Sequence, residues 1–105
     1  MPDDDALLEI RFEADVIYWR GPSPFFYVPI PAEHAVDVRA AAKAASYGWG
    51  VVPVEATIGE TAFTTSLFPK DGSYLLPLKD AVRRATNTTA GDTVAVEMII
   101  RPPRR

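Results

Sequence analysis

The chain contains no cysteine and only one histidine, His34. Without thiols it has neither a disulfide framework nor thiolate chemistry. One histidine among scattered carboxylates does not supply the clustered ligands of a protein metal site, so we predict no metal and no cofactor. No motif gives His34 a nucleophile or an orienting group. We therefore predict that His34 is an exposed helix residue, and we assign no catalytic residues.

Long apolar runs and nucleotide-binding motifs are also missing. No stretch approaches the roughly 20 apolar residues of a membrane span, and the start MPDDDALLE is acidic, unlike the basic start of a signal peptide. Neither GxxxxGK[ST] nor GxGxxG occurs. The net charge of −3 opposes a broad phosphate-binding surface. We expect a cytoplasmic protein that contacts no membrane, and we do not expect nucleic acid as its partner.

What the chain does contain is period-two alternation of apolar and polar side chains, which is typical of strands with one buried face. The longest such stretch covers residues 7–19, and its expected inward side chains are Leu8, Ile10, Phe12, Ala14, Val16 and Tyr18. The other predicted strands are residues 25–31, 51–58, 61–68, 74–77 and 93–101. Gly59-Glu60 suits a two-residue hairpin turn, because glycine can hold a positive φ at the first position. Residues 69–72 suit a second turn.

Two stretches predict helices. Residues 32–46 are rich in alanine, the strongest helix former. Within them Val36, Ala40 and Ala44 lie four apart, and we expect this stripe of small residues to face the sheet. Gly48 and Gly50 fit the end of this helix. Residues 78–86 form the second predicted helix.

These elements give a mainly β fold with two helices in the order β-β-α-β-β-β-α-β. Two short helices cannot cover a flat sheet of six strands, whereas closing the sheet fills its interior and removes its edges. We therefore predict a closed six-stranded barrel with helices over its ends. We expect one domain over residues 1–105, with flexible tails at residues 1–6 and 102–105.

Residues 48–100 and the hairpin sequence YWRGPSPFFYVPIP resemble the bacterial domain-of-unknown-function family 1905. The most specific pieces are TSLFP (residues 65–69), YLLPLKDAVRRA (residues 74–85) and Gly91-Asp92. The resemblance implies a double-split β-barrel capped by helices at both ends. Some members of that family are fused to a bacteriocin-resistance-associated domain. The family has no established activity or catalytic residue set, so the resemblance implies no site.

Residues 73–98 are also similar in outline to AbrB/MazE-type DNA-binding or antitoxin domains. Both contain a strand, a proline (Pro77), a short helix with arginines, and Gly91-Asp92 before a final strand. In AbrB-like proteins two chains build one barrel. Here one chain holds all the predicted strands, so we expect a monomer, with a weak homodimer as the alternative. A monomer has no two-fold axis to match a palindromic DNA site, and DNA-binding regulation stays as an alternative function on fold analogy.

The outward side chains of the first predicted hairpin form an aromatic group, namely Ile17, Trp19, Phe25 and Tyr27. A bare patch of this kind is unusual on a monomer. One interpretation covers it with the alanine-rich helix or with Tyr47 and Trp49. The other makes it a partner-binding surface, since tryptophan and tyrosine are effective anchors.

Two polar groups are further candidates. Lys70, Lys79, Arg83 and Arg84 form a candidate anion-binding set, although an exposed helix face of mixed charge explains them as well. Thr64, Thr65 and Ser66 form a hydroxyl-rich segment that suits either a ligand or simply a strand.

We thus predict a non-catalytic β-barrel module that binds an unidentified protein or a small ligand. Besides the DNA-binding alternative, a third hypothesis is an enzyme that uses hydroxyls and carboxylates at a barrel mouth. Its expected sign is a buried polar pocket with a carboxylate near Ser66 or Tyr74.

Overall fold

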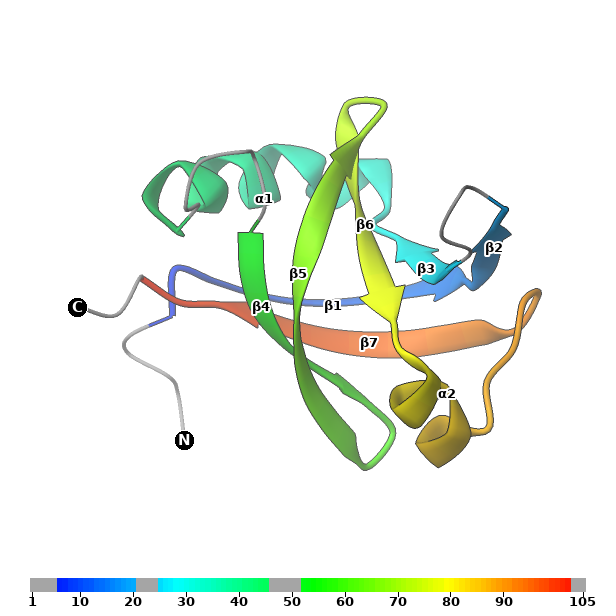
Figure 1. Ribbon diagram of the computed structural model, residues 1–105. Coiled ribbons are helices and arrows are strands. Elements are labelled where there is room, and N and C mark those ends of the chain that lie inside the picture. Colours follow the sequence, from blue (N-terminus) through cyan, green and yellow to red (C-terminus); the bar gives the residue numbers. More distant parts are fainter. Residues whose placement is uncertain (1–5, 21–24, 46–51, 103–105) are drawn as a thin grey trace.

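The computed structural model describes residues 6–20, 25–45 and 52–102, and within them it contains seven strands and two helices (Figure 1). The elements are β1 (Leu8–Asp15), β2 (Ile17–Trp19), β3 (Phe25–Pro29), α1 (Ala32–Ala45), β4 (Val52–Ile58), β5 (Thr61–Lys70), β6 (Ser73–Leu78), α2 (Asp80–Thr86) and β7 (Thr93–Ile100). The expected tail residues 1–5 and 103–105 lie outside the described part of the chain.

The strands form one antiparallel sheet with the order β1-β7-β4-β5-β6-β3-β2. It is an open half-barrel, so the predicted closed barrel of six strands is wrong. The outermost strands, β1 and β2, each pair with a single neighbour. The mainly β class with two helices is confirmed.

The correction has a local cause at Val16, which divides the predicted strand of residues 7–19. Strand β1 pairs with β7 as far as Asp15↔Thr93. The N–H of Val16 then donates to the Asp92 carbonyl (2.8 Å), and the Val16 carbonyl accepts from the Gly91 N–H (2.8 Å). Beyond this point β2 pairs with β3. One predicted strand therefore becomes two, at opposite ends of the strand order.

Strand β5 belongs to both halves of the sheet. Its residues Thr61–Leu67 pair with β4, and Phe68–Lys70 pair with β6. Gly59, with φ 59°, turns β4 into β5 as predicted. The second turn is shorter than predicted: β5 continues through Lys70, and Asp71 and Gly72 alone reverse the chain with φ of 50° and 82°. Two consecutive positive φ values are typical of the tight hairpin turns that match the twist of the strands.

The inner face of the sheet carries one hydrophobic core, and most of the predicted inward side chains lie in it. The side chains that confirm the alternation include Phe12, Val16, Val28, Ile30, Val52, Val54, Ala56, Ile58, Leu67, Val94, Val96, Met98 and Ile100. Tyr18 was also predicted to point inward, but it is exposed beyond the break at Val16.

Helix α1 packs on the core with a different face from the one predicted. Its buried residues are Ala35, Val38, Ala41, Ala42 and Ala45. Val36 is 70% exposed, and Ala40 and Ala44 are exposed with it, so the expected stripe points to solvent. The exposed side of α1 also carries the charged residues Glu33, Asp37, Arg39 and Lys43. The stripe through residues 35, 38, 42 and 45 contains no charged residue, and it packs on the core. Gly48 and Gly50, predicted to end this helix, lie outside the described residues.

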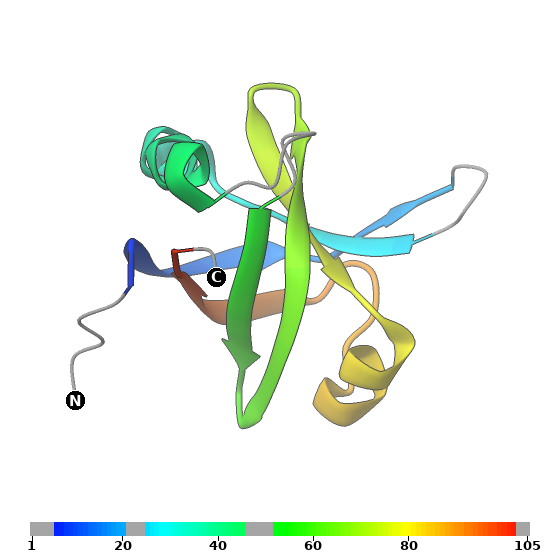
Figure 2. The same cartoon turned by 60° about the vertical axis from the view of Figure 1, so that its left-hand side comes forward.

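Helix α2 is shorter than predicted, because Leu78 belongs to β6. Asn87 closes it in the left-handed conformation (φ 54°), and its N–H points to the carbonyls of Arg83 and Arg84. The two helices lie at opposite ends of the half-barrel (Figures 1 and 2). In the described part of the chain, neither helix has the length and apolarity to cross a membrane.

Candidate functional site

Strand register gathers the predicted aromatic group on one face. Ile17 pairs with Tyr27, and Trp19 pairs with Phe25. Directly paired residues of antiparallel strands project from the same face of a sheet, as do residues two apart. All four side chains therefore share the face of the β2–β3 hairpin that was predicted, and the rings of Phe25 and Tyr27 lie 6.0 Å apart.

The same face continues across β6 into β5. Tyr27 pairs with Pro77, and Leu75 pairs with both Pro29 and Phe68. By register, Phe68 thus shares the face of Tyr27. We call the outward side chains Ile17, Trp19, Phe25, Tyr27 and Phe68 the aromatic face.

Much of the aromatic face is open to solvent. Ile17 is 36% exposed, Trp19 and Phe25 are each 40% exposed, and Phe68 is 45% exposed. The alanine-rich helix does not cover it, because the buried side of α1 is turned to the core. Tyr47 and Trp49, the other predicted cover, lie outside the described residues.

Lys70 borders the aromatic face. Its Nζ lies 4.0 Å from the centroid of the Trp19 ring, a geometry that favours attraction between an ammonium and a ring face. The Asp71 carboxylate lies 3.9 Å from the same Nζ. Lys70 therefore joins the aromatic candidate set.

Of the other basic candidates, Lys79 lines a small hollow with Phe25 and Phe26, and Arg83 contacts the opposite side of the hairpin. The guanidinium carbon of Arg83 is 3.6 Å from the centroid of the Phe26 ring, and an Nη donates to Asp80 (3.2 Å). Phe26 pairs with Tyr18, so it projects from the hairpin face opposite Trp19. Lys70 and Arg83 thus sit over opposite faces of one hairpin, and the four predicted cations do not form a single patch.

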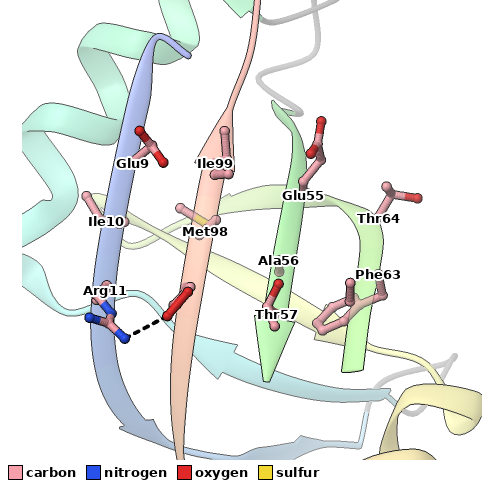
Figure 3. A pocket seen from close by; sticks show the side chains of 12 residues that line it. Glu9, Ile10, Arg11, Glu55, Ala56, Thr57, Phe63, Thr64, Met98 and Ile99 are labelled. Atoms are coloured by element: carbon pink, nitrogen blue, oxygen red, sulfur yellow. Dashed lines mark hydrogen bonds and ion pairs between the residues drawn. The ribbon is translucent and has the colours of Figure 1, made fainter. Parts of the chain in front are cut away.

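A polar groove of about 620 Å³ runs over the outer face of β1, β7, β4 and β5 (Figure 3). One cross-strand row contains Glu9, Ile99, Glu55 and Thr64, which are neighbours by register. The next row contains Arg11, Glu97 and Thr57. No sequence pattern singles out this groove, because its residues meet only through the register of four strands.

The charged groups of the polar groove are already engaged in part. Arg11 donates to Glu97 (2.7 Å), drawn as the dashed line in Figure 3. Arg101 donates from two nitrogens to Glu55 (2.5 and 3.3 Å). Such ion pairs neutralise the carboxylates and hold them in place.

The hydroxyl-rich segment lies beside this groove. Ser66 and Thr64 line an adjoining hollow of about 460 Å³ together with Glu55 and Lys79. A carboxylate does lie near Ser66, which is the sign named for the enzyme hypothesis. The hollow is open rather than buried, and Arg101 holds the carboxylate. The arrangement provides polar contacts for a ligand more readily than it provides a base for a hydroxyl.

A scan against protein-family models extends these observations. The model described as Domain of unknown function (DUF1905) matches residues 12–98. This chain belongs to the DUF1905 family. The matched region of the DUF1905 domain includes every residue of the aromatic face and its neighbour Lys70. No curated protein matches the chain.

His34 of the DUF1905 domain is less exposed than predicted. Its side chain is 20% exposed, and its ring centroid lies 6.1 Å from that of Phe12. Glu33 lies 3.9 Å from its Nε2. His34 is thus a packing residue at the edge of the core. Across the described residues, no three His, Cys, Asp or Glu side chains gather as metal ligands would.

Sequence reasoning missed Phe68. Period-two alternation puts Phe68 on the opposite face from Leu67, which is buried. Its membership of the aromatic face could not be inferred, because that depends on which strands flank β5. The contact between Lys70 and Trp19 has no sequence signal, since the two residues lie on different hairpins.

Proposed function

We propose that this DUF1905 domain is a non-catalytic module that binds a protein partner on the aromatic face. The observation that carries the proposal is the register, which aligns Ile17 with Tyr27 and Trp19 with Phe25 on one exposed face. When a partner covers large rings that are exposed to water, the burial of their apolar surface favours binding by about 25 cal/mol for each Å².

Residue type supports a protein partner. Tryptophan and tyrosine are the residues most enriched among those that dominate binding energy in protein interfaces. The face is also pre-organised, because its side chains stand on paired strands rather than on loops. Rigid anchors lose little conformational entropy on binding.

The polar groove is the competing location, and it suits a small polar ligand. Its carboxylates are largely paired within the chain, with Glu97 on Arg11 and Glu55 on Arg101. A ligand would have to replace these pairs, whereas a partner on the aromatic face displaces only water. We therefore favour the aromatic face.

Peptide selection tests this proposal. A library of random linear peptides displayed on phage is selected on the purified full chain, and the affinities of enriched peptides are measured by fluorescence polarisation. We expect Phe25→Ala to weaken binding about tenfold or more, the loss typical of a central interface residue. Val36→Ala is the matched control, because Val36 is an exposed apolar residue on α1.

The location is read independently from NMR chemical-shift changes on titration with a selected peptide. Shifts confined to β2, β3 and the end of β5 support the proposal. Shifts centred on Glu9, Glu55 and Thr64 would move the site to the polar groove and contradict it. Failure to enrich any peptide that distinguishes Phe25→Ala from wild type also counts against it.

A further inference from the structure

Strand register places one charged side chain beside the aromatic face. The positions that register aligns with the aromatic face across β2, β3, β6 and the end of β5 are Ile17, Trp19, Phe25, Tyr27, Pro29, Phe68, Lys70, Ser73, Leu75 and Pro77. Of these, Leu75 and Pro77 are buried. Among these described residues only Lys70 is charged. Lys79 follows β6 and lines a small hollow with Phe25 and Phe26, so it lies at one edge of the face. A partner lying on the exposed rings therefore meets Lys70 beside Trp19.

The ammonium of Lys70 can donate hydrogen bonds to a partner. It lies 4.0 Å from the Trp19 centroid and 3.9 Å from an Asp71 carboxylate oxygen. The second distance exceeds the 2.7–2.9 Å typical of a charge-assisted hydrogen bond. Nζ carries three donors, and it makes no hydrogen bond within the described residues. A carboxylate from a partner can approach more closely than Asp71 does.

The turn beyond Lys70 is held in place. Asp71 and Gly72 form a tight reversal with positive φ at both residues. An Nη of Arg39 on α1 donates to the Gly72 carbonyl (2.8 Å), which ties the turn to the helix. Lys70 is therefore presented from a fixed support, and less entropy is lost when it pairs with a partner.

The charges of the chain define the partner further. The net charge is −3, so a strongly acidic partner is repelled at long range. Lys70, with Lys79 at the edge of the face, is also far from the row of phosphate contacts that gives nucleic-acid affinity. A single carboxylate next to an apolar anchor is the complementary group.

We propose that Lys70 makes the aromatic face selective for a protein segment that carries one Asp or Glu beside an aliphatic or aromatic anchor. The proposal rests on the function proposed above and adds the chemistry of the partner. The anchor covers the rings of the aromatic face. The carboxylate accepts from Nζ of Lys70, whose position over Trp19 is already set.

Charge exchange tests the inference. Peptides are selected in parallel on the wild-type chain and on Lys70→Glu, and one acidic peptide is compared with its counterpart in which Lys replaces the acidic residue. We expect wild type to prefer the acidic peptide by about two- to fivefold, the range of an exposed ion pair. Lys70→Glu should reverse the preference. Lys70→Met, which keeps the aliphatic stem over Trp19, should abolish it.

Lys43→Glu is the matched control, because Lys43 is an exposed lysine of α1, and its preference should equal that of wild type. If Lys70→Glu keeps the acidic preference while Phe25→Ala still loses binding, the inference is wrong and the proposed function stands. If neither Lys70→Glu nor Phe25→Ala changes binding, both the inference and the proposed function are wrong.

The same experiments can also detect two other occupants of the aromatic face, a second copy of the chain and single-stranded nucleic acid. Light scattering at rising concentration detects a second copy of the chain, and a concentration-dependent dimer lost in Trp19→Ala would overturn the inference. A fluorescent oligothymidylate is the nucleic-acid probe, because aromatic rings beside a lysine also suit stacked bases. Binding of this probe that requires Lys70 and weakens steeply with salt would replace the protein segment with single-stranded nucleic acid.

Discussion

The orientation of α1 can be tested with two valines of one helix. Val38 is fully buried against the core, whereas Val36 is 70% exposed. The structure predicts that Val38→Ala destabilises the fold and that Val36→Ala leaves its stability nearly unchanged. The stripe expected from the sequence predicts the reverse order.

The magnitudes follow from the buried groups. Valine exceeds alanine by two carbons, so Val38→Ala loses about 1.6 kcal/mol of transfer free energy at roughly 0.8 kcal/mol per group, and a residual cavity adds to the loss. Alanine is the better helix former by about 0.6 kcal/mol, which offsets part of it. We expect a net cost of about 1–2 kcal/mol. At Val36 the smaller burial loss of about 0.5 kcal/mol is cancelled by the helix propensity.

Urea unfolding followed by far-UV circular dichroism measures both changes. The two variants should keep the wild-type dependence on urea, so that shifts of the midpoint report stability. In thermal unfolding, Val38→Ala should lower the melting temperature by roughly 4–9 °C. Equal losses in the two variants, or a larger loss in Val36→Ala, would refute the helix orientation and the core derived from it.

Three further predictions concern the turns and the charged surface. Gly72→Ala should cost about 1–2 kcal/mol by urea unfolding, because φ is 82° there although no atom blocks a Cβ. Arg83→Lys should cost about 0.5–1 kcal/mol by losing its planar stacking on a ring, while the exposed Arg84→Lys should be neutral. Glu97→Gln should cost less than about 1 kcal/mol and matter less at high salt, since its ion pair with Arg11 is exposed.

Local pattern was sufficient to predict most strands, because a strand with one buried face has an unmistakable period. It failed at Val16, where the alternation runs on without interruption while the backbone changes partners. That break depends on hydrogen bonds to Gly91 and Asp92, far along the chain. No local rule could reveal it, and the predicted closed barrel failed with it.

The face of α1 could have been predicted better. Small residues fill so much of this helix that several stripes compete. The charged positions decide among them, since Asp37 and Lys43 lie away from the stripe through Val38 and Ala45. The stripe that contains no charged residue is the one that packs on the core.

In the candidate site, too, some residues follow from local sequence pattern and others depend on the strand order. The four residues of the aromatic group were predictable, because pairing within one hairpin follows from alternation alone. Phe68, Lys70 and the polar groove depend on contacts between strands that the sequence separates. Such contacts become visible only once the strand order is known.

The pairing of β1 with β7 sets a kinetic constraint on this fold. Leu8 pairs with Ile100, so this ladder joins opposite ends of the described chain. Closing so long a loop costs entropy before any contact compensates for it, whereas the β4–β5 and β5–β6 hairpins need only their own turns. During synthesis on a ribosome, β1 leaves the ribosome before β7 and has no pairing partner until β7 is made. The alternating Glu9, Arg11 and Glu13 place charge along the unpaired β1, which disfavours its aggregation before β7 is available.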